Sequence, residues 1–232
     1  MKNLPQIPAK KLIIFDMDGV LIDSEVVYHR FHPVFFREHL GIHLTQEEID
    51  GFTGVSSREI YTRYKALYNL PEEPEVYVER EYDLLMGVFG SLEPFPVIEG
   101  IPALLETLRD AGFRLALSSS NQRRMVRLCL ERSGLGPFFE HVLTGEDVPR
   151  AKPDPEIFLR QPPHFGLTPD DCLVIEDSTN GVKAAKTAGM FCIGFVNPNS
   201  GRQNLDPADW RVDAWTTEVV ERLLALGQTT LV

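Results

Sequence analysis

Cysteine is scarce in this chain. Its 232 residues include only three cysteines, Cys129, Cys172 and Cys192. An odd number at wide spacing does not form a disulfide framework, and Cys129 and Cys192 lie in apolar segments that are typical of small core residues. Free thiols suit a reducing compartment, so we expect a cytoplasmic protein.

Long apolar runs are absent as well. Residues 1–8 lack the apolar stretch of a secretory signal, and no segment approaches the roughly 20 apolar residues that a membrane span needs. We therefore expect neither secretion nor a membrane partner.

Positive charge is in the minority. The chain has 23 Lys and Arg against 34 Asp and Glu, which gives a formal net charge of -11 at pH 7. This balance opposes long-range attraction to nucleic acid, so we expect no nucleic-acid partner. If the substrate is an anion, local cations or a metal ion must offset this field. We expect the protein to act as a monomer.

Short apolar strands and amphipathic helices alternate from residue 100 onward. Residues 102–111 carry leucines at helical spacing, and apolar strands are predicted at 113–117, 172–176 and 191–196. Strands that are almost wholly apolar, separated by helices, predict an α/β fold with a Rossmann-like parallel sheet covered on both faces.

Residues 24–95 break this rhythm. They contain no β-branched strand run, but several helical stretches rich in aromatic residues. The sequence therefore predicts a core formed by residues 1–23 and 96–232, with a helical cap formed by residues 24–95. Pro94 and Pro96 restrict the backbone at the exit from the cap, where we expect a hinge.

Two carboxylates follow the first apolar strand, residues 12–15. Asp16 and Asp18 are two residues apart, so at an extended strand end they point the same way, and Gly19 lets the chain turn away from the sheet. Two acidic side chains on one face require a cation, a shared proton or both. Taken alone, the pair favours an Asx turn that caps the next helix over a catalytic site.

Further polar residues follow the other strands. Ser119 and Asn121 come after the second predicted strand, Lys152 precedes a Pro-Asp-Pro segment, and Glu176 with Asp177 ends the next strand. Each has an ordinary structural reading, as a helix cap, a surface lysine or a strand-end charge. Caps do not require two acidic pairs, a lysine and a hydroxyl at one sheet edge, so the set favours a catalytic site.

This ordered set resembles the haloacid dehalogenase superfamily over residues 11–24 and 96–196, with residues 24–95 in the position of that family's helical cap. The runs Asp-Gly-Val-Leu-Ile-Asp-Ser-Glu and Ile-Glu-Asp-Ser are similar to those of its β-phosphoglucomutase-like group of sugar-phosphate phosphatases. The resemblance implies a Mg²⁺-dependent phosphomonoesterase that acts on a small phosphorylated metabolite, a sugar phosphate, through an aspartyl-phosphate.

The resemblance also implies the roles of the acidic residues. Asp16 would attack phosphorus, and Asp18 would protonate the leaving oxygen and then deprotonate water. The Asp16 carboxylate, the Asp18 backbone carbonyl, Glu176 and Asp177 would hold Mg²⁺, a hard cation that prefers oxygen ligands. Asp18 argues against a dehalogenase, because displacing a halide needs no acid there.

The remaining core residues would hold the phosphoryl group. Lys152 would steady the nucleophile and the phosphoryl charge, while Ser119 and backbone N–H groups near Ser120 and Asn121 would contact the phosphoryl oxygens. Gly19 is expected at the same substrate-contacting turn.

The cap is expected to carry specificity. Its candidate substrate-binding residues are Tyr28, His29, Thr53, Gly54, Ser57 and Arg58. The group's mutases have a histidine at the position of Tyr28 and an arginine one position before Arg58, which favours a phosphatase here. A β-phosphoglucomutase-type mutase is the alternative, and a catalytically silent phosphate- or metal-binding module is a further one. The histidines show no metal-site spacing, and His32 is expected at the surface or half buried.

Overall fold

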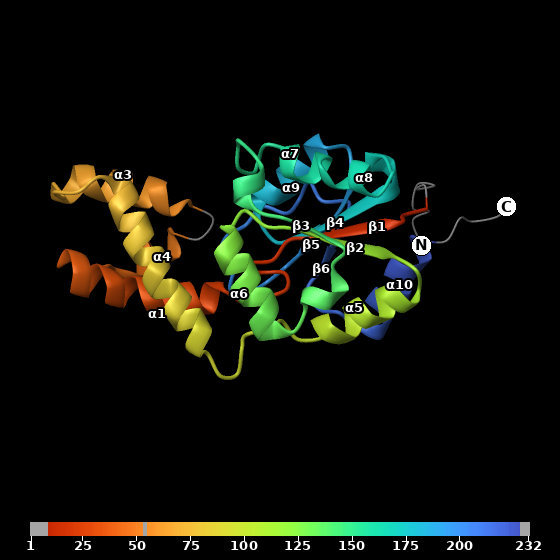
Figure 1. The fold of residues 1–232 in the computed structure, drawn as a ribbon, viewed down its shortest axis with the longest axis horizontal. Helices are drawn as coiled ribbons and strands as arrows, with labels where there is room; N and C mark the ends of the chain where they lie inside the picture. The colour runs from red at the N-terminus through yellow and green to blue at the C-terminus, as the bar shows by residue number, and fades with distance from the viewer. Residues whose placement is uncertain (1–8, 53–54, 228–232) are drawn as a thin grey trace.

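A sheet of six parallel strands lies at the centre of the larger part of the molecule (Figure 1). The computed structural model describes residues 9–52 and 55–227. The strand order is β3-β2-β1-β4-β5-β6, so β1 lies in the middle between β2 and β4. The strands are β1 (Leu12–Phe15), β2 (Arg114–Ser118), β3 (His141–Leu143), β4 (Cys172–Glu176), β5 (Phe191–Phe195) and β6 (Trp210–Val212). The predicted parallel α/β fold is confirmed.

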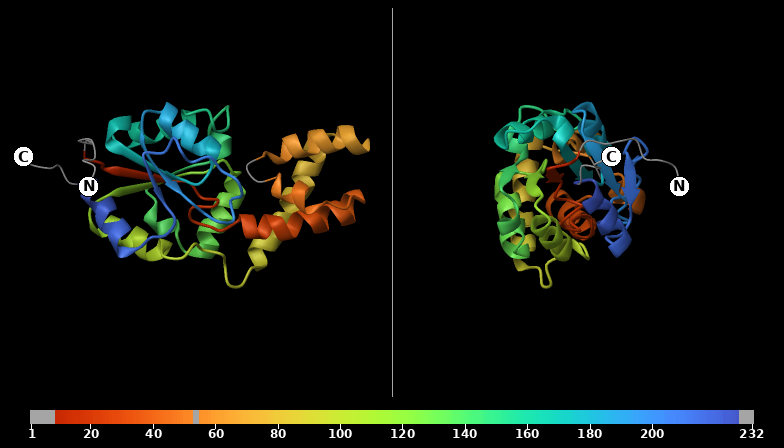
Figure 2. Two further views of the ribbon diagram at one scale, coloured as in Figure 1. Left: turned by 180° about the vertical axis from the view of Figure 1, so that it is seen from behind. Right: turned by 90° about the vertical axis from the view of Figure 1, so that its right-hand side faces the viewer.

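Helices cover both faces of this sheet (Figure 2). Because side chains alternate along a strand, Ile13 and Phe15 pack into one apolar cluster with α5, α6 and α10, while Leu12 and Ile14 pack into another with α7 and α9. The helices and short turns of this part are α5 (Ile101–Asp110), α6 (Arg123–Ser133), η2 (Gly136–Phe138), η3 (Gly145–Asp147), α7 (Glu156–Leu159), α8 (Gln161–His164), η4 (Pro169–Asp171), α9 (Thr179–Thr187) and α10 (Thr217–Ala225).

The segment between β1 and α5 forms a separate helical layer beside the sheet (Figure 1). Its elements are α1 (Glu25–Phe35), η1 (Phe36–Leu40), α2 (Gln46–Asp50), α3 (Ser57–Tyr68) and α4 (Pro74–Ser91). We call residues 24–95 the helical unit. It has its own apolar cluster, centred on Phe35, Phe36, Tyr61 and Tyr64. An aromatic-rich segment without strands therefore folds around a small core of its own.

One sequence expectation fails inside the helical unit. His32 is 7% exposed, and its Nε2 lies 2.8 Å from Oε1 of the buried Glu81 on α4. It packs edge-on against the ring of Phe52. His32 is thus an interior residue, because the pairing with a carboxylate makes burial of its polar ring tolerable.

The predicted strands and helix after residue 100 agree with the structure to within about a residue at each end, which is the ordinary scatter of boundaries. Two strands were not predicted, β3 and β6. Each has three residues and lies at an edge of the sheet, where partial exposure removes the continuous apolar run of a central strand.

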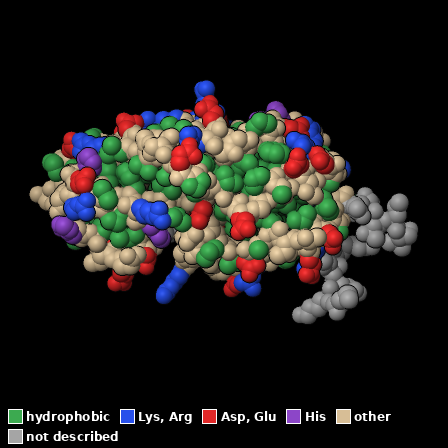
Figure 3. All heavy atoms as spheres, turned by 90° about the horizontal axis from the view of Figure 1, so that it is seen from below, with side chains coloured by type: hydrophobic (Ala, Val, Ile, Leu, Met, Phe, Trp, Pro, Cys, Tyr) green, Lys and Arg blue, Asp and Glu red, His purple; other side chains and the backbone are tan. Residues whose placement is uncertain are grey.

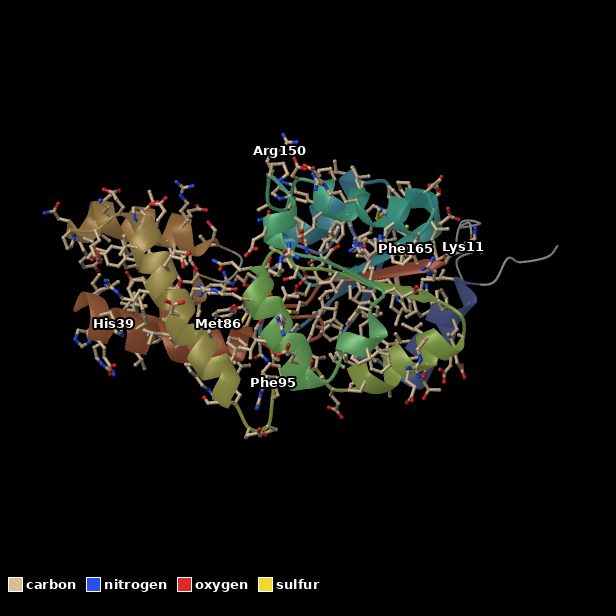
Figure 4. The ribbon with its side chains drawn as sticks, viewed as in Figure 1. Lys11, His39, Met86, Phe95, Arg150 and Phe165 are labelled. Carbon is tan, nitrogen blue, oxygen red and sulfur yellow. The ribbon has the colours of Figure 1, made fainter. Side chains whose placement is uncertain are left out.

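The direction of the strands positions the polar residues. All six run toward the helical unit, so their carboxyl ends meet at its boundary (Figures 1 and 2). In Figure 4, Lys11 and Phe165 lie at the opposite end of the sheet, Met86 of α4 lies near the boundary, and His39 lies at the remote end of the helical unit. Open α/β sheets bind ligands at this carboxyl edge.

Side chains of both signs are scattered over the face seen in Figure 3. None of the helices in the described part of the chain has the length and apolar character of a membrane span.

Leu105 tests the packing of α5 on the sheet. It is fully buried, so Leu105→Ala should lower the free energy of unfolding by about 2–5 kcal/mol through lost contacts and the cavity left behind. Urea unfolding measures this change. The exposed Glu106→Ala on the same helix is the control and should change it by less than about 0.5 kcal/mol; equal effects would contradict this packing.

Candidate active site

The Lys152 ammonium is the centre of the polar edge. Its Nζ donates hydrogen bonds to Asp16 Oδ1 at 2.5 Å, Glu176 Oε1 at 2.8 Å and the Ser118 carbonyl at 3.0 Å. These acceptors come from the ends of β1, β4 and β2, so one side chain joins three strands. Three donors meet three acceptors, and the Lys152 side chain is only 5% exposed.

This lysine stays charged although it is buried. Burial alone would lower its pKa, but the carboxylates of Asp16 and Glu176 outweigh burial and raise the pKa above its ordinary value. Nζ also lies over the Phe158 ring, 4.8 Å from its centroid. The site therefore contains a fixed positive charge next to Asp16.

Three carboxylates gather around this cation. Asp16, Glu176 and Asp177 each offer an oxygen within 4.8 Å of the other two, and all three residues are buried. Three negative charges against the one on Lys152 leave two uncompensated when all carboxyls are ionised. A set of hard oxygen donors with that excess fits a divalent cation such as Mg²⁺.

Two glycines allow this close approach. A Cβ on Gly19 would lie 1.9 Å from Asp177 Oδ2, and one on Gly181 would lie 1.7 Å from Glu176 Oε1. Gly19 also has φ of +77°, which side-chain-bearing residues rarely adopt. The carboxylates therefore lie directly against the backbone of the turn after β1 and the first turn of α9.

Burial shifts the acidic groups toward their protonated forms. Burial raises the pKa of Asp16 to about 8, with Glu176 and Asp18 adding to the rise and Lys152 opposing it. Burial likewise raises the pKa of Asp177, and Glu176 and Asp16 reinforce it. A cation entering this cluster would displace protons from it.

Asp18 lies at the same turn but has different partners. Burial raises its pKa, whereas the hydrogen bonds it accepts lower it. Asn121 Nδ2 is 3.4 Å from Asp18 Oδ2. Two carboxyl groups two residues apart thus have separate environments, one beside a cation and one beside an amide, as separate acid–base roles require.

The predicted serine turn lies at the end of β2. The Ser119 hydroxyl is buried and accepts a hydrogen bond from the Asn121 N–H at 3.1 Å. Its own hydrogen bond to Asp18 is among those that lower the pKa of that carboxyl. The hydrogen bond to Ser119 occupies the Asn121 N–H, which we had expected to face a phosphoryl oxygen. Ser120 is exposed next to it.

The predicted residues of the helical unit lie in different surroundings. The Tyr28 hydroxyl is 3.4 Å from Asn121 Nδ2, which places it at the polar edge, and His29 follows on α1. Ser57 begins α3, and Arg58 pairs with Glu75 at 2.7 Å while 75% exposed. Within residues 9–52 and 55–227, no hydrogen bond or ion pair joins Ser57 or Arg58 to the sheet-containing part. Thr53 and Gly54 lie outside the described residues.

Sequence reasoning missed the loop after β5. Asn197 Nδ2 donates to the Gly19 carbonyl at 3.0 Å, and the Ser200 hydroxyl donates to Asp177 Oδ2. Asn199 Nδ2 donates to Asp23 Oδ2 at 2.8 Å. These residues hold the turn after β1 and orient Asp177. The signal was a polar run directly after an apolar strand, the same pattern that identified the other site residues.

A second omission comes from the helical unit. The Tyr82 hydroxyl on α4 donates to Asn121 Oδ1 at 3.0 Å. No sequence motif marks it, because an aromatic residue in an amphipathic helix is ordinarily part of an apolar face.

Lys152→Met tests the fixed charge. Without the ammonium, Asp16 and Glu176 are buried and unpaired, so the free energy of unfolding in chelator at pH 8.5 should fall by about 3–5 kcal/mol. The deficit should shrink toward pH 5, since groups with raised pKa bind protons in the folded state and regain stability as pH falls. Urea unfolding at both pH values measures this.

Lys11→Met is the matched control. Lys11 pairs with Asp171 at 2.9 Å but is 61% exposed, so its loss should cost less than about 1 kcal/mol. Equal, pH-independent losses in the two variants would contradict a special role for the buried ammonium.

Comparison with known proteins identifies one family and several similar enzymes. Residues 13–195 match the family model described as haloacid dehalogenase-like hydrolase. A phosphorylated carbohydrates phosphatase of Thermotoga maritima is 32% identical over 196 residues, which are 84% of this chain and 89% of the relative. A β-phosphoglucomutase of Bacillus subtilis is 30% identical over 190 residues, 79% of this chain and 82% of the relative.

The fold agrees with solved structures. A β-phosphoglucomutase from Clostridium difficile superposes with a TM-score of 0.76 at 23% identity, over 93% of this chain and 97% of that one. At this identity the likeness concerns the fold.

Proposed function

The chain belongs to the haloacid dehalogenase-like hydrolases, and from that premise we propose that it is a Mg²⁺-dependent phosphomonoesterase acting on a small phosphorylated metabolite. It is a hydrolase of phosphate esters. We favour a sugar phosphate as the substrate class, because its relatives include a phosphorylated carbohydrates phosphatase and a β-phosphoglucomutase. The observation that carries the proposal is the pairing of buried Asp16 with Lys152 beside Glu176 and Asp177.

Asp16 is the proposed nucleophile. Lys152 binds its Oδ1, which leaves Oδ2 to attack phosphorus and form an aspartyl-phosphate. The hydrogen bond also holds the carboxylate in one orientation, so the attack loses little entropy. Splitting one difficult displacement into two easier ones is the gain from a covalent step.

Asp18 is the proposed acid and base. Its raised pKa favours the protonated form, which can give a proton to the leaving oxygen as the ester bond breaks. The resulting carboxylate then accepts a proton from the water that attacks the aspartyl-phosphate. One group serves both half-reactions and ends in its starting state.

Asp16, Glu176 and Asp177 would hold Mg²⁺, with the Asp18 backbone carbonyl as a further ligand. The cation would supply positive charge that offsets the phosphoryl oxygens. Lys152 adds a second positive charge, and the Ser119 hydroxyl would donate to a phosphoryl oxygen of the bound substrate. These cations explain how a protein with net charge -11 accepts an anion.

The helical unit favours hydrolysis over transfer between sugars. Tyr28 stands where the mutases of the group have a histidine, and Arg58 is neutralised by Glu75 instead of being directed to the site. A mutase needs a cation for the second phosphate of its intermediate. We therefore propose a phosphatase, with residues 24–95 acting as a cap that covers the site and excludes bulk water.

The proposed setting is cytoplasmic and monomeric. Cys129, Cys172 and Cys192 are free and buried, which supports a reducing compartment.

Asp16→Asn tests the nucleophile. With Mg²⁺ present, the wild type should release phosphate from at least one ester among glucose 6-phosphate, β-glucose 1-phosphate, glycerol phosphate, phosphoglycolate and p-nitrophenyl phosphate. The variant should lose on the order of a thousandfold or more in kcat, because an amide cannot form the covalent intermediate. The exposed Asp110→Asn is the control and should retain wild-type turnover.

Phosphate release and sugar-phosphate isomers are followed together. Isomer formation without free phosphate would identify a mutase and contradict the proposal. Silence in both measurements would favour a binding module. Full turnover by Asp16→Asn would contradict Asp16 as the nucleophile.

Magnesium binding should depend on pH. Because burial raises the pKa of Asp16 to about 8 and also raises that of Asp177, the cation must displace protons, and its affinity should rise from pH 6 to pH 8. Isothermal titration calorimetry of Mg²⁺ in two buffers of different ionisation enthalpy measures affinity and proton release. Asp110→Asn should behave as wild type; binding without proton release, at equal affinity across this range, would contradict the assigned ligands.

A further inference from the structure

The side-chain amide of Asn121 is a meeting point between the helical unit and the sheet edge. Its Nδ2 is 3.4 Å from Asp18 Oδ2 and 3.4 Å from the Tyr28 hydroxyl. Its Oδ1 accepts hydrogen bonds from the Tyr82 hydroxyl at 3.0 Å and the Gln122 N–H at 2.9 Å. Two partners therefore come from the helical unit, Tyr28 on α1 and Tyr82 on α4.

These contacts use the whole amide. An asparagine side chain has two donor hydrogens and one acceptor oxygen with two lone pairs, and each of these has a partner here. The Gln122 N–H and the Tyr82 hydroxyl are both donors and lie at the same end of the Asn121 amide. The acceptor Oδ1 therefore faces these donors, and the NH₂ group faces Asp18. A carboxylate oxygen and an amide oxygen turned toward each other would repel.

Tyr82 is fixed as a donor. Burial raises the pKa of its hydroxyl, so the proton stays on oxygen throughout the working range of the protein. Arg124 on α6 lies over the Tyr82 ring, with its guanidinium carbon 4.2 Å from the centroid, and pairs with Asp83 at 2.6 Å. These contacts hold α4 against α6 and set the position of the hydroxyl.

Resting on the proposed phosphatase activity, we propose that Tyr82 is a positioning residue that orients the Asn121 amide toward Asp18 and so couples packing of the helical unit to the acid–base carboxyl. When α4 packs on α6, Tyr82 donates to Oδ1 and the NH₂ group faces Asp18. When α4 moves away, this donor is lost and the hold on Asp18 weakens.

The dependence of kcat/KM on the leaving group tests this role of Tyr82. Departure of an alkoxide needs a proton from Asp18, whereas p-nitrophenolate is stable enough to depart with little help. The ratio kcat/KM reports steps up to the departure of the leaving group, so a misoriented acid lowers it for alkyl phosphates and spares the aryl ester. General damage to the fold would lower both.

Tyr82→Phe is the test, because it removes the hydroxyl and keeps the ring under Arg124. For the alkyl phosphate of the panel that the wild type hydrolyses fastest, kcat/KM should fall about tenfold. For p-nitrophenyl phosphate it should stay within about twofold. The control is Tyr64→Phe, which removes a hydroxyl that donates to Glu48 at 2.9 Å within the helical unit and should change neither value.

Every outcome is decisive. Equal losses on both esters, or no loss on either, would overturn the role of Tyr82 while leaving the phosphatase intact. The same selective loss in Tyr64→Phe would also overturn it, since any change to the helical unit would then suffice. A wild type that releases no phosphate from either kind of ester would overturn the proposed function and this inference with it.

Discussion

The hydrogen bonds of the Lys152 ammonium are the constraint on which the rest of the site depends. They join the carboxyl ends of β1, β2 and β4, and they hold Asp16 and Glu176 close together although like charges repel. Without the ammonium, burial would make the repulsion between the two carboxylates strongly destabilising. With it, burial strengthens their attraction to Lys152, because a low dielectric magnifies both repulsion and attraction. The glycines at 19 and 181 are a consequence, since the gathered carboxylates leave no room for a Cβ.

The same edge separates two kinds of carboxyl chemistry. Asp16 lies beside a fixed cation and is suited to attack, whereas Asp18 lies beside the Asn121 amide and is suited to carry a proton. This division arises because the turn after β1 sends successive carboxylates toward different neighbours. The helical unit contacts this edge through Tyr28 and Tyr82, whose hydroxyls meet the Asn121 amide. Its Arg58 is paired with Glu75.

Other buried polar groups are also stabilised by hydrogen bonds from distant segments. The loop after β5 supplies Asn197 to the Gly19 carbonyl and Ser200 to Asp177, so the turn that bears both proposed catalytic carboxyls is held from a third direction. In the helical unit, His32 is interior because Glu81 accepts its hydrogen bond. The partners of Gly19, Asp177 and His32 in these contacts come from segments far away in the chain.

The sequence by itself determined the parallel α/β fold and most residues at the carboxyl edge, because strand periodicity is local and polar residues at strand ends must meet there. The short edge strands β3 and β6 were not predicted, since partly exposed strands lack the continuous apolar run of a central strand. Only the tertiary structure decided that Lys152 pairs with both Asp16 and Glu176, that Ser200 orients Asp177, and that Tyr82 reaches Asn121. The reason is physical: these contacts join residues more than 20 positions apart, and their geometry depends on how whole helices and strands pack, which no local pattern encodes.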